Sequence, residues 1–203
     1  MKHKFQVIEE QEITLANAVG AYLDCEHYVF LHGGIMPEMF AEKLEGRRIT
    51  YRQGLRWGFL RSAHIFTTEY FPPGHFRTFD LKSSPKWMPS LHHVVKMVID
   101  VRYTKHPERD TTLMQFDVEL DMPFWLWPFR RILQGIMERM HYKKDQEDIE
   151  MIQRRAKIFG PHNISSYLAE GQFLLFKDDY VRHFGASARH STDSPATSAA
   201  RLL

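Results

Sequence analysis

Residues 122–161, MPFWLWPFRRILQGIMERMHYKKDQEDIEMIQRRAKIFGP, decide the fold. Apolar side chains recur at helical spacing through this stretch, which predicts one long amphipathic helix over residues 122–159. Pro128 suits the first turn of a helix, and Gly160 followed by Pro161 suits its end. The apolar stripe of the predicted helix consists of Phe129, Ile132, Leu133, Ile136, Met137 and Met140.

The chain before this helix is rich in strand signals. Residues 5–13 alternate apolar and polar, which is typical of a strand with one solvated face. Residues 15–31 have helical spacing after the N-cap residue Thr14, and a second short helix is predicted at 36–44. β-branched and aromatic segments follow, separated by turn residues, and predict an antiparallel meander. These segments are residues 47–60, 63–71, 75–83, 92–104 and 111–121.

This order of elements predicts an α+β fold of the helix-grip type, resembling the START and Bet v 1-like proteins. In that plan an antiparallel sheet wraps around a long C-terminal helix and leaves a cavity between them. We expect one domain over residues 1–184, with a further short helix near residues 170–184. Residues 185–203 are rich in Ser, Thr, Ala and Pro and predict a disordered tail.

Composition excludes several classes of function. The 203 residues carry 27 basic and 25 acidic side chains, a net charge of +2, so nucleic acid is not an expected partner. The one cysteine, Cys25, excludes a disulfide framework, a zinc ribbon and a cysteine-ligated iron–sulfur cluster in this chain. No signal peptide and no membrane span is predicted, and a reducing cytoplasm fits this cysteine usage.

The motif D-x2-H-x4-H in LDCEHYVFLH (residues 23–32) is the sharpest chemical signal. It contains Asp24, His27 and His32. Two neutral imidazoles with one carboxylate suit Fe(II), because they leave coordination positions open for O2 and substrate. A spacing of five residues places the two imidazoles about 140° apart on a straight helix, so joint ligation requires a helix that is distorted or ends here. The alternative is that both are ordinary histidines.

The predicted long helix offers a carboxylate that could complete such a site. Asp148 falls near its apolar face, whereas Asp145 lies about 60° further toward the polar side. A carboxylate buried in a core favours a metal or a cationic partner. Asp145 remains an alternative third ligand, and a surface ion pair of Asp148 with Lys144 or Arg155 is an alternative to ligation.

Both motifs resemble the catalytic domain of the Rieske-type non-haem iron oxygenases, a helix-grip domain. LDCEHYVFLH is similar to that family's iron-binding helix, and QEDIEMI to the C-terminal helix that supplies its third ligand. The resemblance implies that His27, His32 and Asp148 bind Fe(II). It also implies that Asp24 links the iron to the electron-donating cluster. The chain lacks the family's Rieske [2Fe-2S] domain, so a separate ferredoxin or Rieske-type protein would have to donate the electrons.

The resemblance implies hydroxylation or demethylation of a hydrophobic substrate, aromatic or sterol-like, by a mononuclear iron oxygenase. A non-enzymatic START-like carrier of a lipid or small hydrophobic ligand is the alternative, and it needs the cavity but no metal. A cyclase or hydratase with His, Asp or Tyr as acid–base groups is a third hypothesis. Homo-oligomerisation is compatible with each. The apolar run of Phe124, Trp125 and Trp127 suggests a lid or a docking patch.

Overall fold

A seven-stranded antiparallel sheet dominates the computed structural model, which describes residues 1–31, 38–57, 60–84 and 94–191. Its strand order is β1-β7-β6-β5-β4-β3-β2, so the first strand of the chain pairs with the last. The strands are β1 (Lys2–Gln11), β2 (Glu38–Glu45), β3 (Arg48–Trp57), β4 (Leu60–Phe71), β5 (His75–Ser84), β6 (Lys96–Lys105) and β7 (Thr112–Asp121).

Alternation of side chains explains why these segments form one sheet. Along β7, Thr112, Met114 and Phe116 are buried while the residues between them are half-buried, and the pattern continues to Leu120. Burial in β1 follows the same period of two, and every second residue of β6 from Met97 to Tyr103 packs against the core. One face of the sheet therefore meets the core, as the sequence pattern predicts.

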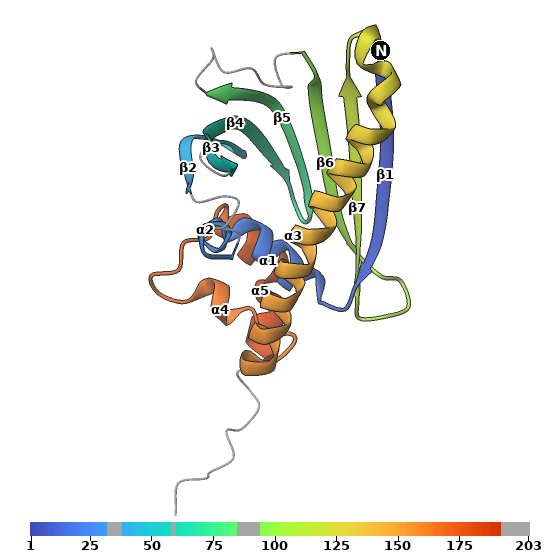
Figure 1. Cartoon of the computed structure of the whole chain (residues 1–203). Coiled ribbons are helices and arrows are strands. Elements are labelled where there is room, and N and C mark those ends of the chain that lie inside the picture. The colour runs from blue at the N-terminus through green and yellow to red at the C-terminus, as the bar shows by residue number, and fades with distance from the viewer. Residues whose placement is uncertain (32–37, 58–59, 85–93, 192–203) are drawn as a thin grey trace, which may run out of the picture.

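The helices cover the concave face and one end of the sheet (Figure 1). The long helix α3 runs along β1, β7 and β6, and the shorter helices gather at one end. This is the predicted α+β helix-grip architecture, which is confirmed. The helices are α1 (Leu15–Leu23), α2 (Glu26–Leu31), the 3-10 helix η2 (Phe124–Phe129), α3 (Arg130–Phe159), α4 (Ser165–Leu168) and α5 (Lys177–Ser191). None of these described helices is long and apolar enough to cross a membrane.

Several predicted boundaries need correction. The helix predicted at 36–44 is wrong, because residues 38–45 form β2, which pairs antiparallel with β3. The predicted helix at 15–31 divides at Asp24 into α1 and α2. The long helix begins at Arg130 rather than 122, because the preceding residues form η2 with Pro128 inside it. Helix α5 continues through Gly185 to Ser191, and residues 192–203 lie outside the description.

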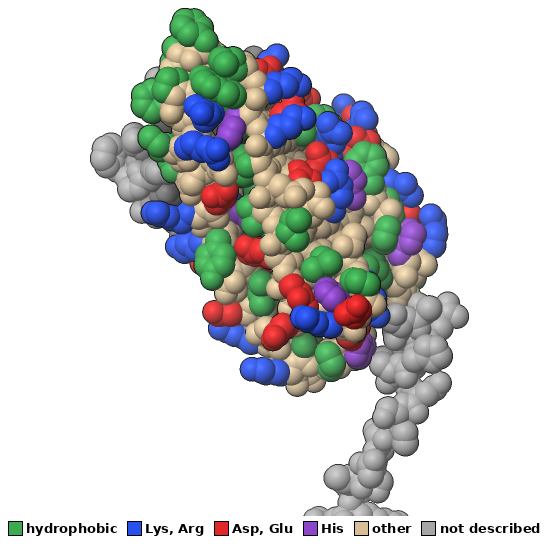
Figure 2. Space-filling view, turned by 90° about the vertical axis from the view of Figure 1, so that its right-hand side faces the viewer, with side chains coloured by type: hydrophobic (Ala, Val, Ile, Leu, Met, Phe, Trp, Pro, Cys, Tyr) green, Lys and Arg blue, Asp and Glu red, His purple; other side chains and the backbone are tan. Residues whose placement is uncertain are grey.

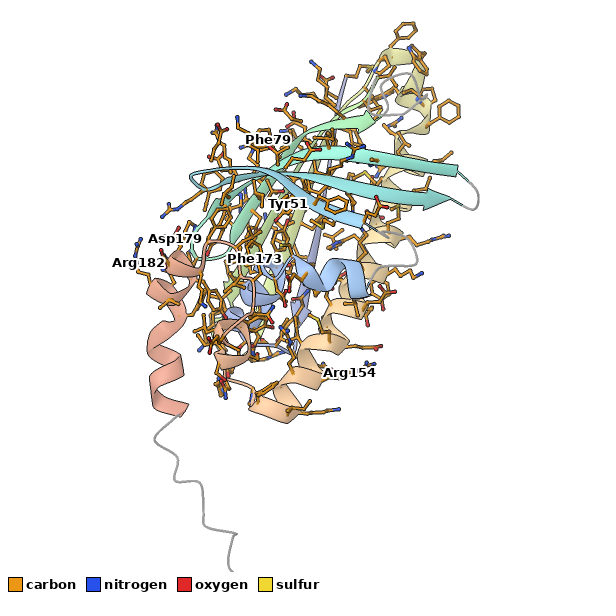
Figure 3. All side chains as sticks on the ribbon, turned by 90° about the vertical axis from the view of Figure 1, so that its left-hand side faces the viewer. Tyr51, Phe79, Arg154, Phe173, Asp179 and Arg182 are labelled. Atoms are coloured by element: carbon orange, nitrogen blue, oxygen red, sulfur yellow. The ribbon has the colours of Figure 1, made fainter. Side chains whose placement is uncertain are left out.

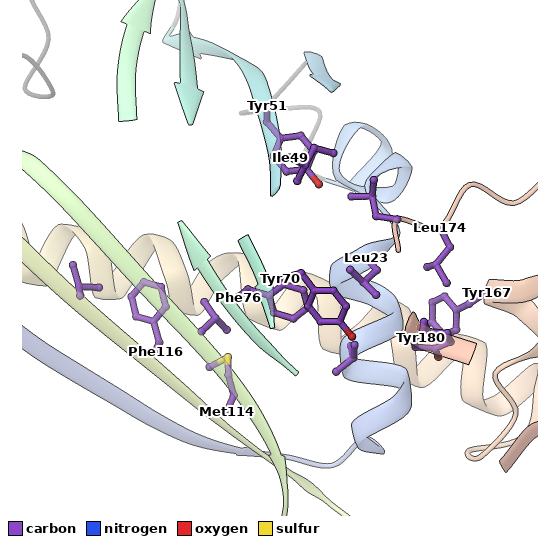
Figure 4. Packing of buried hydrophobic residues seen from close by; sticks show 14 of the residues in the cluster. Leu23, Ile49, Tyr51, Tyr70, Phe76, Met114, Phe116, Tyr167, Leu174 and Tyr180 are labelled. Carbon is purple, nitrogen blue, oxygen red and sulfur yellow. The ribbon is translucent and has the colours of Figure 1, made fainter. Parts of the chain in front are cut away.

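The core lies where α1 and α5 meet the inner face of the sheet. Figure 4 shows Tyr70 and Phe76 beside Leu23 of α1, with Tyr167 and Tyr180 close by. The rings of Tyr70 and Phe76 stack with centroids 4.9 Å apart. Most of the driving force for folding comes from the burial of such apolar surface. This end of the molecule is therefore the rigid support for anything that α1 and α2 carry.

Helix α3 packs against this core through a narrow strip. Leu133 and Met137 contact the core and are half-buried, whereas other members of the predicted apolar stripe are exposed. The exposed members are Phe129, Ile132, Ile136 and Met140. The fully buried residues of α3 are Asp145 and Ile152, both in its second half. The first half of α3 thus has two apolar sides, one toward the sheet and one toward solvent.

Candidate functional site

The junction between α1 and α2 positions the first two residues of the D-x2-H-x4-H motif. Asp24 is the C-cap of α1, and its backbone N–H bonds the carbonyl oxygens of Gly20 and Ala21 at 3.0 and 3.2 Å. The backbone carbonyl oxygen of Asp24 in turn bonds Nδ1 of the buried His27. A ring nitrogen held by a backbone carbonyl carries the proton, so Nε2 of His27 is the atom available as an electron-pair donor.

Asp148 of α3 lies beside that nitrogen. The distance from His27 Nε2 to Asp148 Oδ1 is 3.3 Å, and the His27 side chain is almost fully buried. Asp145 is directed elsewhere, because its Oδ2 accepts a hydrogen bond of 2.7 Å from Gln11 Nε2 on β1. Of the two aspartates considered as the third ligand, Asp148 is therefore the one that faces His27. Two of the three residues predicted to bind iron come together.

The third predicted ligand, His32, lies outside the described residues. Within the described ranges, no group of three or more His, Cys, Asp or Glu side chains is arranged to hold a metal ion. The observed geometry comprises one imidazole and one carboxylate. A buried imidazole that is fixed through Nδ1 and faces a carboxylate through Nε2 fits two ligands of a mononuclear site.

Asp24 uses its side chain for a different contact. Its Oδ2 forms an ion pair of 3.2 Å with Arg155 Nη1 of α3, and the carboxylate is 2% exposed. The Arg155 guanidinium also lies 4.7 Å from the centre of the Tyr167 ring. The sequence suggested Arg155 as a surface partner of Asp148, whereas it pairs with Asp24 here. Asp24 orients His27 through its backbone, and its buried charge ties α3 to the end of α1.

A second acidic group, Asp145, lies next to this site. The sequence pattern placed it toward the polar side of the long helix, and this is wrong, because the structure buries it. Asp145 is buried, and its side chain hydrogen-bonds with Glu9 as well as Gln11. Burial, together with the charges of Glu9 and Asp148, raises the pKa of Asp145 to about 7. The sequence did contain a signal for polar groups at this place. In the alternating strand at 5–13, Glu9 and Gln11 share the inward face with Phe5.

A small cavity of mixed polar and apolar lining touches both Asp145 and Asp148. Its volume is about 20 Å³, and Gln11, Tyr22, Tyr103, Asp145 and Asp148 are among its lining residues. That volume holds about one water molecule. Burial raises the pKa of Tyr22 to about 12, so its phenol stays protonated at neutral pH. This end of the interior combines polar and apolar side chains and is nearly filled.

Further along α3, the side chains between the helix and the sheet are apolar and half-buried. Met97 and Ile99 of β6 share their face with the buried Val101, and Leu133 and Met137 of α3 contact the same core. Phe66 of β4 contacts the same cluster. All five are only half-buried although they face inward. Apolar groups in this position are typical of a site for a hydrophobic ligand, and methionine side chains adapt readily to its shape.

Comparison with solved structures identifies the fold. A START superfamily protein from Mycobacterium smegmatis matches with a TM-score of 0.55 and 16% identity, over 74% of this chain and 99% of that one. The chain has the START/Bet v 1-like helix-grip fold. The Zhui aromatase/cyclase from Streptomyces matches with a TM-score of 0.58 and 9% identity, over 77% of this chain and 96% of its own. Norcoclaurine synthase from Thalictrum flavum matches with a TM-score of 0.59 and 8% identity, over 76% and 96%.

These helix-grip likenesses establish the fold alone, because the identities are low. No family model and no curated protein matches the chain. The resemblance to Rieske oxygenases thus gains support at the level of the fold but not for that family specifically.

Proposed function

We propose that this protein binds a hydrophobic small molecule between the concave face of the sheet and α3. The half-buried apolar side chains of Met97, Ile99, Leu133 and Met137 carry this proposal, because they face inward yet remain accessible. An apolar ligand in this space would remove their surface from water, which stabilises the complex by about 25 cal/mol for each Å² buried. The similarity of the fold to a START superfamily protein and to an aromatase/cyclase supports a role of this kind.

The test is saturable binding of an apolar fluorescent probe, 1-anilinonaphthalene-8-sulfonate, and its displacement by fatty acids and by fused-ring aromatics. Met137→Arg places a charge in the proposed site and should weaken binding about tenfold or more. The matched control is Ile158→Arg on the same helix, where the native side chain is 75% exposed. Absence of saturable binding, or equal affinity in Met137→Arg, would overturn the proposal.

One observation favours a second candidate, a mononuclear metal centre. It is the approach of His27 Nε2 to Asp148 Oδ1 at 3.3 Å, with the opposite ring nitrogen fixed by Asp24. His27 and Asp148 would hold Fe(II) together with His32. Bound Fe(II) supplies the O2 chemistry of a hydroxylase or demethylase, with electrons from a separate ferredoxin or Rieske-type donor. Asp24 would keep the His27 imidazole oriented, and the apolar interior would hold the substrate.

Iron content after anaerobic Fe(II) loading, followed by desalting, tests this second candidate. The wild type should retain about one iron per chain, and Asp148→Ala should lose it. Asp145→Asn is the matched control, because that side chain faces Gln11 and should leave retention unchanged. If the wild type retains no iron, the proposal of a metal centre is wrong. The proposal of hydrophobic binding still stands, since probe binding requires no metal.

A further inference from the structure

A cluster of exposed aromatic and aliphatic side chains forms one extreme end of the molecule. Within η2, Leu126 and Trp127 contact the core, whereas Phe124 and Trp125 point outward. Phe129 and Ile132 extend the exposed surface into the first turn of α3. The exposed fractions are 78% for Phe124, 53% for Trp125, 51% for Phe129 and 61% for Ile132. We call these four residues the aromatic tip.

The aromatic tip is a protruding surface. Figure 2 shows hydrophobic side chains gathered at the upper end of the molecule, with Lys and Arg side chains directly beside them. In Figure 1 the same end carries η2 and the start of α3. A contiguous apolar surface of this kind marks an interaction site. Exposed aromatic and aliphatic side chains at a protruding end can insert into the headgroup region of a lipid layer.

Charge distinguishes the kind of partner. Residues 122–137 contain two arginines, Arg130 and Arg131, and no acidic residue. Arg130 is fixed at the base of the tip, since its Nη1 donates to the Trp127 carbonyl oxygen at 3.0 Å and its guanidinium lies 4.8 Å from the centre of the Trp127 ring. Acidic residues flank this stretch, but each has a partner. Asp121 pairs with the N-terminal ammonium group, and Glu138 accepts a hydrogen bond from Gln134. Glu119 pairs with Lys2 and Lys4.

We propose that the aromatic tip docks on the surface of an anionic membrane. Tryptophan and phenylalanine rings are stable at the level of lipid headgroups, and guanidinium groups bind the phosphates there. Docking is peripheral, by insertion of side chains into one leaflet. The inference does not rest on the proposed ligand, because it follows from the outer surface alone.

Flotation with lipid vesicles tests the docking. Wild-type protein should float with vesicles of phosphatidylcholine and phosphatidylglycerol but remain unbound with phosphatidylcholine alone. The double variant Phe124→Ser and Trp125→Ser should not float with either. The matched control is Ile158→Ser with Phe159→Ser, two exposed apolar residues at the other end of α3, and it should float as the wild type does. Circular dichroism establishes that both variants fold.

A separate variant tests the contribution of positive charge to membrane binding. Arg131→Gln should lower partitioning onto anionic vesicles about fivefold, and added salt should reduce the difference from neutral vesicles. Equal flotation on neutral and anionic vesicles would overturn the charged part of the proposal. Flotation that persists in the tip variant, or none in the wild type, would overturn it entirely. Self-association of the wild type that is lost in the tip variant would instead identify the tip as a contact between two copies.

Discussion

His27 Nε2 lies 3.3 Å from Asp148 Oδ1. His27 belongs to α2, which follows β1, and Asp148 belongs to α3, which follows β7, so six of the seven strands separate them in the sequence. The contact depends on the break between α1 and α2, which turns His27 toward α3. The same break places Asp24 against Arg155, so two acid–base contacts join the start and the end of the fold.

Fe(II) should stabilise the protein if the second candidate is correct. Binding at a concentration a hundredfold above the dissociation constant contributes about 2.7 kcal/mol, which corresponds to a rise in Tm on the order of 5 °C for a domain of this size. We expect this rise in anaerobic differential scanning fluorimetry, its reversal by a chelator, and its absence in His27→Ala. An equal rise in His27→Ala would place the metal elsewhere.

Loss of Arg155 should destabilise the fold more than loss of its neighbour. Arg155→Met leaves the buried Asp24 carboxylate without its cation, and we expect a loss of about 2–3 kcal/mol in the free energy of unfolding. Arg154 is 76% exposed, against 26% for Arg155, and it points into solvent beside α3 (Figure 3). Arg154→Met should therefore cost less than about 0.5 kcal/mol. Urea unfolding measures both, and equal losses would contradict the role given to Asp24.

Asp145 should make stability depend on pH. Its pKa is raised from the ordinary 3.8 to about 7 in the folded state, so folding favours the protonated carboxyl. The stability that this provides is fully present below about pH 4 and is lost as the pH rises through 7. The free energy of unfolding of Asp145→Asn, relative to that of the wild type, should therefore rise by on the order of 1–4 kcal/mol as the pH goes from 4 to 8.

The measurement is urea unfolding of both proteins across that range, with the exposed Asp178→Asn as control. The variant must be compared with the wild type because the contribution of His141 to stability increases with pH, whereas that of Asp145 decreases. Burial and the charge of Lys144 lower the pKa of His141 to about 4, so its neutral form contributes stability that is lost as the pH falls below about 6.5. This contribution cancels in the difference between Asp145→Asn and the wild type. A difference that does not change with pH would contradict the prediction.

Replacing two helical glycines by alanine should change the stability of the fold in opposite directions. A Cβ atom on Gly20 would lie 2.8 Å from Tyr180 Oη and 2.9 Å from Tyr167 Cδ2, so Gly20→Ala should cost about 1–3 kcal/mol. A Cβ on Gly135 of α3 meets no atom within 4 Å, and Gly135→Ala should add about 0.5–1 kcal/mol through helix propensity. Thermal unfolding tests the pair. Two changes of the same sign would contradict the close packing of α1.

Sequence patterns predicted the elements whose periodicity is long and regular, such as β7 and α3. The sequence predicts a helix at 36–44 because the charged and apolar residues there suit either structure, whereas pairing with β3 makes residues 38–45 a strand. The approach of His27 to Asp148 followed from the two motifs and the fold to which they belong. The Glu9–Asp145 contact was predictable only in part: alternation places Glu9 on the inward face of β1, but no local pattern shows how β1 packs against α3. Ile132 and Ile136 belong to the predicted stripe, but only tertiary packing decides which side of a helix is covered.

The pairing of β1 with β7 also sets an order of events during synthesis. Lys2 pairs with Asp121 and Gln11 with Thr112, so β1 has no partner until the ribosome has produced residues 112–121. Contacts of such large sequence separation form slowly, because a long loop must close first. Until then Phe5 and Val7 lack their cross-strand neighbours Val118 and Phe116, and a strand left unpaired with exposed apolar side chains is prone to aggregation.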